Sequence, residues 1–551
     1  MSRKRVVIVG GVAGGATCAA RLRRMDENAE ILLLDRGPYV SFANCGLPYY
    51  VGNVIHDEAK LLLATPALFR ERFNIEVRTC NEVVSIDRAA RTIAVHDLDT
   101  GREYREHYDA LVLSPGSAPV RPPCCGIDLP GIFTLRSIPD SREIRTWIDS
   151  KDPRKAVVVG GGFIGLEMAE NLAHRGIAVT IVELADQIMP PLDREMAEYA
   201  REQLIARGIR LRMGEGVASF EQPPSGGLIV RTQGGAALDA DIVVLAIGVR
   251  PEAKLAREAG LEIGKRGGIR VDSRMRTSDP HIWAVGDAVE VQNRLTGQWE
   301  LIPLAGPANR QGRVAADTIC GRDAEFDGVL ATAVCGFFGL TVALTGATEK
   351  CLRRAGIDDF QCVYLHPNQH VSYYPSAHPI HIKLVFRKSD GRVLGAQAIG
   401  EADVARRIDV IATAIQMNAT VFDLENAELC YAPQFGAAKD AVNLAGMAAA
   451  NVLRGDVALA PWQELDDTDA YIVDVREPHE FHRDSVDGAV NIPLGQLRSK
   501  MAGLPHDREI WVSCGIGQRA YYACRILTQH GFRARSLSGG YQTYRVMYPL
   551  E

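Results

Sequence analysis

The sequence predicts an α/β fold built from several parallel-sheet units. Two glycine-rich turns, at residues 10–15 and 160–165, each follow a short apolar strand and precede a helical pattern. A third strand, at residues 510–513, runs directly into a cysteine-containing loop and another helix. Strands that alternate with helices in this way are typical of parallel sheets covered by helices. The 551 residues are enough for about two to four domains.

The composition is that of an ordinary globular protein, with 24% charged and 47% hydrophobic residues. A formal net charge of −6 argues against nucleic acid as a main partner. The 12 cysteines are scattered and form no Cys-x-x-Cys pair, which indicates free thiols in a reducing compartment and predicts no metal site. Neither a signal peptide nor an apolar run of the ~20 residues that span a bilayer is visible, so we expect a cytoplasmic protein without a membrane partner.

The first glycine-rich turn carries most of a dinucleotide-binding fingerprint. Gly10 and Gly15 occupy the first and third glycine positions, whereas Val12 stands in place of the second and is followed by Ala13. The next strand ends in Asp35, about 20 residues further on, where an acid accepts ribose hydroxyls.

The second glycine-rich turn has the complete fingerprint, with Gly160, Gly162 and Gly165 at the three glycine positions. The strand that follows its helix ends in Glu183. A carboxylate at this point suits an unphosphorylated ribose and would repel a 2′-phosphate. We therefore expect this unit to bind NADH in preference to NADPH.

Residues 41–50, just beyond the first nucleotide unit, contain Cys45 with Gly46 and Pro48 close behind it. If the first unit holds FAD, this thiol can meet the flavin ring. At a helix N-terminus, the helix dipole and unpaired N–H groups would lower the pKa of the thiol. The alternative is an inert cysteine in a loop.

Two later strand ends belong with the first nucleotide unit. One buried strand ends at Ser114 and enters a turn at Gly116, and another ends in a Gly-Asp pair whose acid is Asp287. The Asp287 carboxylate can accept the ribityl hydroxyls of a flavin. Between these strands, Cys124 and Cys125 adjoin in a Pro-rich loop, where a vicinal disulfide is an alternative to two free thiols.

The last ~90 residues predict a different kind of unit. Cys514 follows the strand at 510–513, a six-residue loop closes on Arg519, and a helix comes next. Such a loop directs successive backbone N–H groups at one sulfur, so it would stabilise a thiolate or a persulfide anion.

These motifs together resemble a known family. A nucleotide unit split by a second nucleotide unit and followed by Gly-Asp resembles the flavoprotein disulfide reductases with two dinucleotide-binding domains. Ser-Phe-x-x-Cys-Gly-Leu-Pro-Tyr-Tyr around Cys45 resembles their single-cysteine branch, which includes NADH oxidases, NADH peroxidases and coenzyme A-disulfide reductases. The oxidases and peroxidases place a histidine near the position of Ala13, so its absence disfavours peroxide reduction.

The C-terminal motifs Asp-Val-Arg-Glu, Gly-x-x-x-Asn-Ile-Pro and Cys-x-x-x-x-Arg resemble a rhodanese, or sulfurtransferase, domain. A degenerate rhodanese with only a structural role is the alternative. The whole chain thus resembles a coenzyme A-disulfide reductase fused to a rhodanese domain, the NADH-dependent persulfide reductase type.

The resemblance implies a domain order and a homodimer. It predicts two Rossmann-like dinucleotide-binding domains for FAD and NADH, an α+β dimerisation domain and a C-terminal rhodanese α/β domain. The predicted boundaries are 1–150 and 271–325 for the FAD-binding domain, 151–270 for the NAD(P)H-binding domain, 326–450 for the dimerisation domain, 451–465 for a linker and 466–551 for the rhodanese domain.

It also implies roles for individual residues. Cys45 would be the redox cysteine, and Cys514 with Arg519 would carry sulfane sulfur. Tyr373 and Tyr431 from the partner subunit would stand beside the redox cysteine, although Tyr374 neighbours the first of them. The coenzyme A ligands would be Ser41, Asn44, Arg21, Arg24, Asn309 and Arg310, with a solvated basic helix face as the alternative for the arginines at 21 and 24.

The resulting hypothesis is an FAD-dependent oxidoreductase that uses NADH to reduce coenzyme A persulfide, polysulfide or coenzyme A disulfide through Cys45. The rhodanese domain would handle sulfane sulfur. Two alternatives stay open. One is an NADH oxidase or peroxidase that cycles Cys45 through a sulfenic acid, and the other is a thiol redox sensor.

Overall fold

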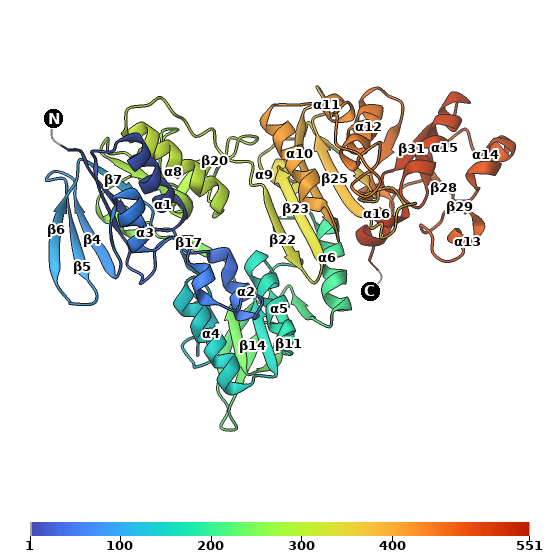
Figure 1. The fold of residues 1–551 in the computed structure, drawn as a ribbon. Helices are drawn as coiled ribbons and strands as arrows, with labels where there is room; N and C mark the ends of the chain where they lie inside the picture. The colour runs from blue at the N-terminus through green and yellow to red at the C-terminus, as the bar shows by residue number, and fades with distance from the viewer. Residues whose placement is uncertain (1–2, 550–551) are drawn as a thin grey trace. The chain divides into compact units, whose positions relative to one another are not determined.

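Two parallel five-stranded sheets hold the two glycine-rich turns in a computed structural model that describes residues 3–549 (Figure 1). The first has the strand order β19-β7-β1-β2-β3, and the second has the order β12-β11-β10-β16-β9. Their central strands are buried on both faces, which explains why the sequence shows continuous apolar runs there instead of alternation. The strands of the first sheet are β1 (Arg5–Val9), β2 (Glu30–Leu34), β3 (Glu76–Arg78), β7 (Ala110–Leu113) and β19 (Ile282–Ala284). Those of the second are β9 (Ile132–Thr134), β10 (Lys155–Val159), β11 (Ala178–Glu183), β12 (Arg210–Met213) and β16 (Ile242–Leu245).

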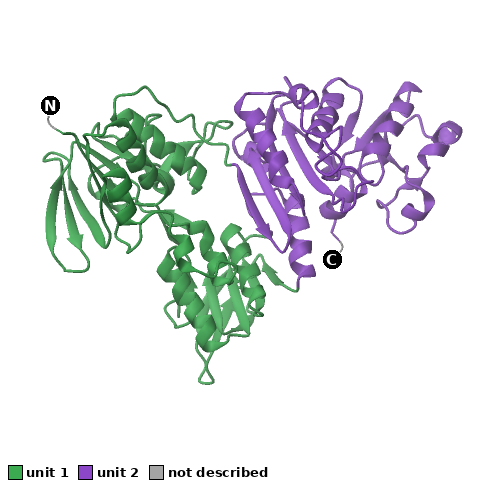
Figure 2. Ribbon diagram, in the orientation of Figure 1, with its two compact units in different colours: residues 1–186, 208–331 green, residues 187–207, 332–551 purple. Residues whose placement is uncertain are grey.

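The chain divides into two units, and both parallel sheets belong to unit 1, residues 1–186 and 208–331 (Figure 2). The helices of unit 1 are α1 (Ala13–Met25), α2 (Leu47–Val51), α3 (Pro66–Phe73), α4 (Ile138–Lys151), α5 (Phe163–His174), α7 (Lys254–Glu258) and α8 (Ala305–Ile319). Its antiparallel ribbons are β4 (Asn81–Asp87), β5 (Thr92–Asp97) and β6 (Glu103–His107), and β13 (Val217–Glu221), β14 (Leu228–Thr232) and β15 (Ala237–Ala240). Short pairings join β8 (Ser117–Pro119) to β17 (Val249–Pro251), and β20 (Val289–Gln292) to β18 (Ile269–Arg270) and β21 (Trp299–Glu300).

Unit 2, residues 187–207 and 332–551, begins with an antiparallel sheet of order β22-β23-β26-β25-β24. Its strands are β22 (Ala333–Phe337), β23 (Leu340–Gly346), β24 (Gln361–Leu365), β25 (Ile380–Phe386) and β26 (Val393–Gly400). The accompanying helices are α6 (Arg194–Ala206), α9 (Glu349–Arg354), α10 (Val404–Gln416), α11 (Val421–Glu425) and α12 (Ala441–Leu453). Helix α6 thus groups with the later part of the chain, although the sequence pattern assigns it to the NAD(P)H-binding domain. The finer domain boundaries stay a prediction.

The C-terminal part of unit 2 is a parallel sheet of order β27-β31-β30-β28-β29. Its strands are β27 (Ala458–Ala460), β28 (Tyr471–Asp474), β29 (Val490–Asn491), β30 (Ile510–Ser513) and β31 (Ala534–Leu537), and its helices are α13 (Pro478–Phe481), α14 (Leu494–Lys500), α15 (Gln518–Gln529) and α16 (Tyr541–Met547). The segment predicted as a linker is mostly structured, because α12 extends into it and β27 forms the edge of this sheet. The predicted α/β class is confirmed.

Lys383 on β25 explains why α6 groups with unit 2. The ammonium group is buried and lies 2.8 Å from Asp193 Oδ2, 2.5 Å from Glu195 Oε1 and 3.0 Å from Glu349 Oε2. These carboxylates come from the start of α6 and from α9. A buried charge needs such partners, since desolvation of an unpaired ion is costly.

Replacing Lys383 with methionine should lower the free energy of unfolding by about 3–5 kcal/mol, because three largely buried carboxylates lose their cation. The shift of the urea unfolding midpoint measures this loss. Lys254→Met is the matched control, since the Lys254 side chain is 81% exposed and its ion pair with Glu258 is long, at 3.9 Å. Equal shifts in the two variants would contradict the prediction.

Candidate functional site

The predicted FAD ligands of unit 1 lie at one edge of the first sheet. Gly10, Asp35 and Ser114 follow the carboxyl ends of β1, β2 and β7, and Asp287 follows β19 within the 3₁₀ turn Gly286–Ala288. These four strands are neighbours in the order β19-β7-β1-β2. Ligands of open parallel sheets bind at this edge, in the crevice where the strand order reverses.

The turn after β1 needs its glycines for its own geometry. Gly10 has φ +93°, and a Cβ there would lie 2.0 Å from Ser114 O. A Cβ on Gly15 would lie 1.9 Å from Gly10 O. Val12 precedes α1 and Ala13 is its first residue, so the turn tolerates a side chain at the second glycine position.

The two acids at this edge are oriented by the backbone and by polar side chains. Asp35 accepts hydrogen bonds from Gly11 N and Gly37 N, both at 2.8 Å, and burial raises the pKa of its carboxyl group. Asp287 Oδ2 accepts from Ser117 Oγ at 2.9 Å and from Arg136 Nη2 at 3.4 Å. Gly116, with φ +76°, makes the turn between Ser114 and Ser117. These carboxylate acceptors fit the hydroxyl-rich ribose and ribityl groups of FAD.

The second fingerprint has room for a phosphate. A Cβ on Gly160 would lie 2.4 Å from Ala246 O, and one on Gly165 would lie 1.9 Å from Gly160 O, so both glycines are required by the turn. A Cβ on Gly162 would meet nothing within 4 Å. Protein packing therefore does not demand this glycine, whereas close approach of a pyrophosphate does.

Glu183 ends β11 beside this turn. Its Oε2 accepts a hydrogen bond from Gly161 N at 2.6 Å, and its Oε1 accepts one from Ala185 N at 2.8 Å. The carboxylate is thus fixed next to the position where the adenosine ribose of a bound nucleotide would lie.

Cys45 lies in the 3₁₀ turn Asn44–Gly46, directly before α2, and is exposed. Its thiol pKa is raised, which is opposite to the direction that a helix N-terminus would give. The largest cause is desolvation, because protein atoms crowd the sulfur even though the residue presents surface to solvent, and the charges of Glu167 and Asp287 add to it. Arg136 opposes the shift.

Ser41 and Asn44 hold the cysteine loop in place. Ser41, with φ +49°, donates its N–H to Gly11 O at 2.8 Å. In the amide orientation that pairs both ends of its side chain, Asn44 accepts from Arg136 Nη1 at 2.7 Å and donates to Phe42 O at 3.2 Å. These contacts tie the loop to the first glycine-rich turn and to the arginine beside Asp287.

Glu167 is a functional candidate that the sequence patterns did not single out. It lies one turn inside α5, and Tyr49 Oη of α2 donates a hydrogen bond to its Oε1 at 3.4 Å. Burial raises the pKa of its carboxyl group to about 7, with a smaller contribution from Glu170. The only sequence signal is an acid two residues after Gly165, and its closeness to the cysteine depends on the packing of α5 against α2.

Replacing Glu167 with glutamine should lower the pKa of the Cys45 thiol, because a neighbouring negative charge disappears. Alkylation of Cys45 at pH 8 should become about threefold faster. At pH 6 the native carboxyl group is protonated, so the two rates should converge there. Mass spectrometry of the Cys45 peptide after timed iodoacetamide treatment measures the rates. The control is Glu71→Gln, an exposed change on α3, and identical profiles for Glu167→Gln and the native chain would contradict the prediction.

The predicted coenzyme A ligands on helices α1 and α8 differ in their surroundings. Arg21 is mostly buried and pairs with Asp317, with 2.8 Å between Nη2 and Oδ1. This ion pair joins α1 to α8 and leaves Arg24 as the exposed arginine of the predicted pair. Asn309 Nδ2 donates to the Ala305 carbonyl at 2.9 Å, and the Arg310 guanidinium lies 5.1 Å from the centre of the Phe326 ring.

Unit 2 brings the two predicted tyrosines together. The Tyr373 and Tyr431 hydroxyls lie 3.1 Å apart, and this hydrogen bond raises the pKa of Tyr373. The neighbouring Tyr374 instead packs edge-on against His370, with ring centres 5.4 Å apart. Tyr373 is 73% exposed and Tyr431 is 47% exposed.

Cys514 follows β30 in unit 2 and is fully buried. Gly517 N donates a hydrogen bond to its Sγ at 3.1 Å, as expected for a loop that surrounds a sulfur anion. The Arg519 guanidinium makes two hydrogen bonds to Glu480, of 2.6 and 2.7 Å, and these lower the pKa of Glu480 to about 2. Arg519 is therefore held beside the loop by α13.

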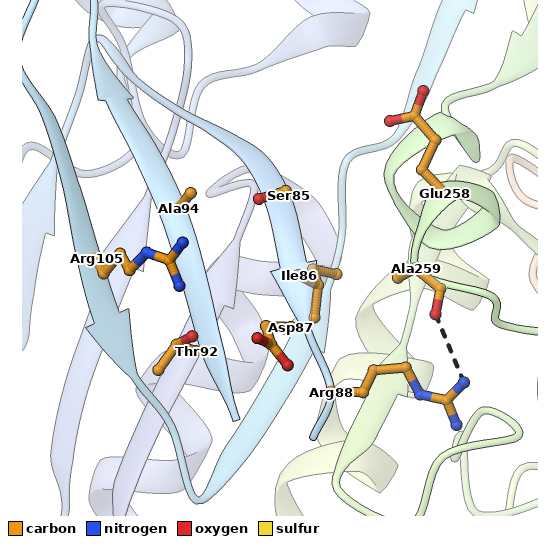
Figure 3. A pocket seen from close by; sticks show the side chains of 9 residues that line it. All are labelled: Ser85, Ile86, Asp87, Arg88, Thr92, Ala94, Arg105, Glu258 and Ala259. Atoms are coloured by element: carbon orange, nitrogen blue, oxygen red, sulfur yellow. Dashed lines mark hydrogen bonds between the residues drawn. The ribbon is translucent and has the colours of Figure 1, made fainter. Parts of the chain in front are cut away.

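A separate pocket of about 420 Å³ lies between the β4-β5-β6 ribbon and α7 (Figure 3). Arg88 borders it and donates to Ala259 O at 3.5 Å, while its Nε bonds to Asp279 Oδ2 at 2.7 Å. The pocket contains none of the predicted site residues. Its lining is Ser85, Ile86, Asp87, Arg88, Thr92, Ala94, Arg105, Glu258 and Ala259.

Three family models match the chain. They are pyridine nucleotide-disulphide oxidoreductase at residues 4–312, the dimerisation domain of the same family at 332–442, and the rhodanese-like domain at 460–546. Among the described residues, no helix combines the length and apolarity needed to cross a membrane.

Relatives match along most or all of the chain. The coenzyme A disulfide reductase of Staphylococcus haemolyticus is 33% identical over 444 residues, which is 80% of this chain and 98% of the relative. The crystal structure of reduced Bacillus anthracis CoADR-RHD has a TM-score of 0.97 and 46% identity, covering 100% of this chain and 99% of that one. An NAD-dependent persulfide reductase from A. fulgidus has a TM-score of 0.91 and 38% identity, covering 98% and 100%.

Proposed function

The chain belongs to the pyridine nucleotide-disulphide oxidoreductase family and is an oxidoreductase, and on that premise we propose that it uses NADH to reduce coenzyme A persulfide, polysulfide or coenzyme A disulfide through Cys45. The observation that carries the proposal is the position of Cys45 in the loop after β2. Ser41 N bonds this loop to Gly11 O of the first glycine-rich turn, and the charges of Asp287 and Glu167 act on the Cys45 thiol. Relatives that act on coenzyme A disulfide and on persulfides support this substrate class.

Family membership implies FAD and NAD(H) as cofactors. We assign FAD to the edge formed by Gly10, Asp35, Ser114 and Asp287, and NADH to the turn that contains Gly162. When bound, FAD supplies a two-electron relay between NADH and sulfur. The N-termini of α1 and α5 would hold the phosphate groups of these cofactors, and the carboxylates of Asp35 and Glu183 would orient their ribose groups.

The Cys45 thiolate would attack the sulfur of coenzyme A persulfide that is bonded to coenzyme A, so that Cys45–S⁻ and CoA–S–SH give Cys45–S–S–CoA and HS⁻. With coenzyme A disulfide, the leaving group is the second coenzyme A thiolate. Two electrons and one proton then restore the Cys45 thiolate and release coenzyme A. Arg136 favours the thiolate, and Glu167 can hold a proton near neutral pH.

The substrate site would be completed by a second copy of the chain. Tyr373 and Tyr431 form one hydrogen-bonded pair, which can hold or deliver a proton for the leaving thiolate. Ser41 and Asn44 would border the pantetheine arm, and the phosphate ligands would be Arg24, Asn309 and Arg310, with Arg21 behind them. None of the 12 cysteines is joined in a disulfide, which supports a reducing, cytoplasmic compartment.

The proposed function is tested by NADH consumption with each acceptor and by the mass of the purified protein. Turnover with coenzyme A persulfide but not with peroxide, together with adducts of the masses of FAD and coenzyme A, supports it. Fast turnover with oxygen or peroxide would instead indicate an oxidase or peroxidase. Absence of turnover with every acceptor would indicate a redox sensor.

Glu183 should make the enzyme prefer NADH over NADPH by about tenfold or more in kcat/KM, since the 2′-phosphate would meet a fixed carboxylate. Glu183→Gln should bring the ratio of kcat/KM for NADH to kcat/KM for NADPH closer to one, because the negative charge is lost while the side chain keeps its shape. Steady-state kinetics with both nucleotides measures the ratio, and Glu221→Gln on β13 is the control. A native enzyme with the higher kcat/KM for NADPH would refute the assignment.

A further inference from the structure

The loop that carries Cys514 is supported from behind by the start of α16. Tyr541 N donates a hydrogen bond to Cys514 O at 2.6 Å, and Gln542 N donates one to Gly515 O at 3.0 Å. A Cβ on Gly540 would lie 2.2 Å from Cys514 O. The loop and this segment are therefore in backbone contact, and a shift of one displaces the other.

The opposite side of the same segment contacts the antiparallel sheet of unit 2. Tyr364 N on β24 donates a hydrogen bond to Ser538 Oγ at 2.9 Å. Just after β24, His366 Nε2 lies 3.0 Å from Thr543 Oγ1. A Cβ on Gly539 would lie 2.0 Å from Thr543 Oγ1 and 2.9 Å from His366 Nε2, so the three groups are packed without a gap. The support of the Cys514 loop thus comes partly from outside the parallel sheet that contains the cysteine.

His366 is itself held in one orientation. Its Nδ1 lies 2.8 Å from His381 Nδ1 on β25, and the His381 ring stacks on Tyr199 of α6 with 4.0 Å between ring centres. Tyr199 Oη donates a hydrogen bond to Gln542 O at 2.9 Å, so the stacked rings are also bonded to the residue before Thr543. Burial lowers the pKa of both histidines, so both rings are neutral and one Nδ1 donates to the other. The remaining ring nitrogen of His366, Nε2, faces the Thr543 hydroxyl and the backbone of Gly539.

We propose that His366, acting through the Thr543 hydroxyl, positions the Cys514 loop, so that the antiparallel sheet of unit 2 is a working part of the sulfurtransfer site. This inference rests on the proposed role of Cys514 as the carrier of sulfane sulfur. His366 and Thr543 are positioning residues, since they reach the sulfur only through the segment 538–543. They would determine the orientation of the N–H groups, such as Gly517 N, that stabilise the sulfur anion.

Sulfur transfer through this loop can be assayed with thiosulfate and cyanide as probes. The Cys514 thiolate takes one sulfur from thiosulfate, which gives Cys514–S–S⁻ and sulfite. Cyanide then removes that sulfur as thiocyanate and restores the thiolate. No external oxidant or reductant is needed.

The test compares Thr543→Val, which keeps the shape but removes the hydroxyl, with Thr543→Ser, which keeps the hydroxyl. In the full-length chain, Thr543→Val should lower kcat for sulfur transfer about tenfold with little change in KM, and Thr543→Ser should restore it. NADH-dependent reduction of free coenzyme A persulfide should be the same in both variants. A native rate in Thr543→Val, or equal losses in both variants, would overturn the proposal.

A second measurement separates this proposal from the proposed function. The rate of iodoacetamide labelling of the Cys514 peptide needs no sulfur donor, and it should change about threefold or more in Thr543→Val but not in Thr543→Ser. If the native chain transfers no sulfur, the proposed role of Cys514 fails, and labelling alone decides whether Thr543 positions the loop. If Thr543→Val does not fold, His366→Gln takes its place in both measurements. The same changes in sulfur-transfer rate and labelling rate are expected, and native values of both rates in His366→Gln would refute the proposal.

Discussion

Replacing Cys45 with serine should abolish NADH-dependent reduction of coenzyme A persulfide, by on the order of 10³-fold or more, yet leave FAD bound and reducible by NADH. A serine hydroxyl at this position is un-ionised and forms no disulfide, so the mixed disulfide with coenzyme A is lost. The proposed FAD ligands should be unaffected, since Gly10, Asp35 and Asp287 lie on other elements.

Anaerobic stopped-flow absorbance at the flavin band measures the reduction of FAD by NADH. NADH consumption in the presence of coenzyme A persulfide measures the complete reaction. Cys125→Ser is the matched control, because Cys125 is an exposed free thiol of unit 1 outside the predicted site. The single-cysteine mechanism would be wrong if Cys45→Ser turned over coenzyme A persulfide at a near-native rate. Loss of flavin from the variant would assign a structural role to the thiol.

Residues at the ends of parallel strands were predictable because local pattern is enough to place them. Gly10, Asp35, Ser114 and Asp287 are far apart in the sequence, yet each follows a buried strand. Strands of one parallel sheet point the same way, so their carboxyl ends meet at one edge. The same rule placed Cys514 after β30.

The electrostatics of the Cys45 thiol could not be predicted in this way. Glu167 acts on it because α5 packs against α2, and Arg136 acts on it from the segment before α4. Neither contact follows from spacing along the chain. A helix N-terminus at Cys45 would lower the pKa of the thiol, but desolvation and the charges of Glu167 and Asp287 raise it.

Tertiary packing decides one choice that the sequence left open and one grouping that differs from the predicted boundaries. Tyr373 and Tyr374 are adjacent and of one kind, and only the fold shows that the first bonds to Tyr431 while the second packs on His370. Helix α6 has an ordinary amphipathic pattern that fits either neighbour in sequence. The buried ammonium of Lys383 decides its place, since that charge needs the carboxylates at the start of α6.

The second prediction of large effect concerns the reason for joining a rhodanese to a reductase. Sulfur carried as Cys514–S–SH is bound covalently and does not diffuse away. Attachment to the same chain raises its effective concentration at an acceptor to roughly millimolar, provided the geometry lets donor and acceptor meet. Cys514 should therefore serve sulfane donors too bulky or too charged to reach Cys45 unaided, and it should be dispensable for free coenzyme A persulfide.

Cys514→Ser should accordingly lose thiosulfate-dependent sulfur transfer and turnover of protein-bound or long-chain polysulfides, by on the order of 100-fold or more, while NADH oxidation with free coenzyme A persulfide stays within about twofold of native. Cys335→Ser is the control, because Cys335 is a buried thiol of the same unit on β22. Steady-state NADH oxidation with each donor and each variant is the measurement. Equal loss on every donor would place Cys514 on the obligatory path of all substrates. No loss on any donor would reduce the domain to a structural role, because the buried Cys514 and its Gly517 hydrogen bond would then serve no transfer step.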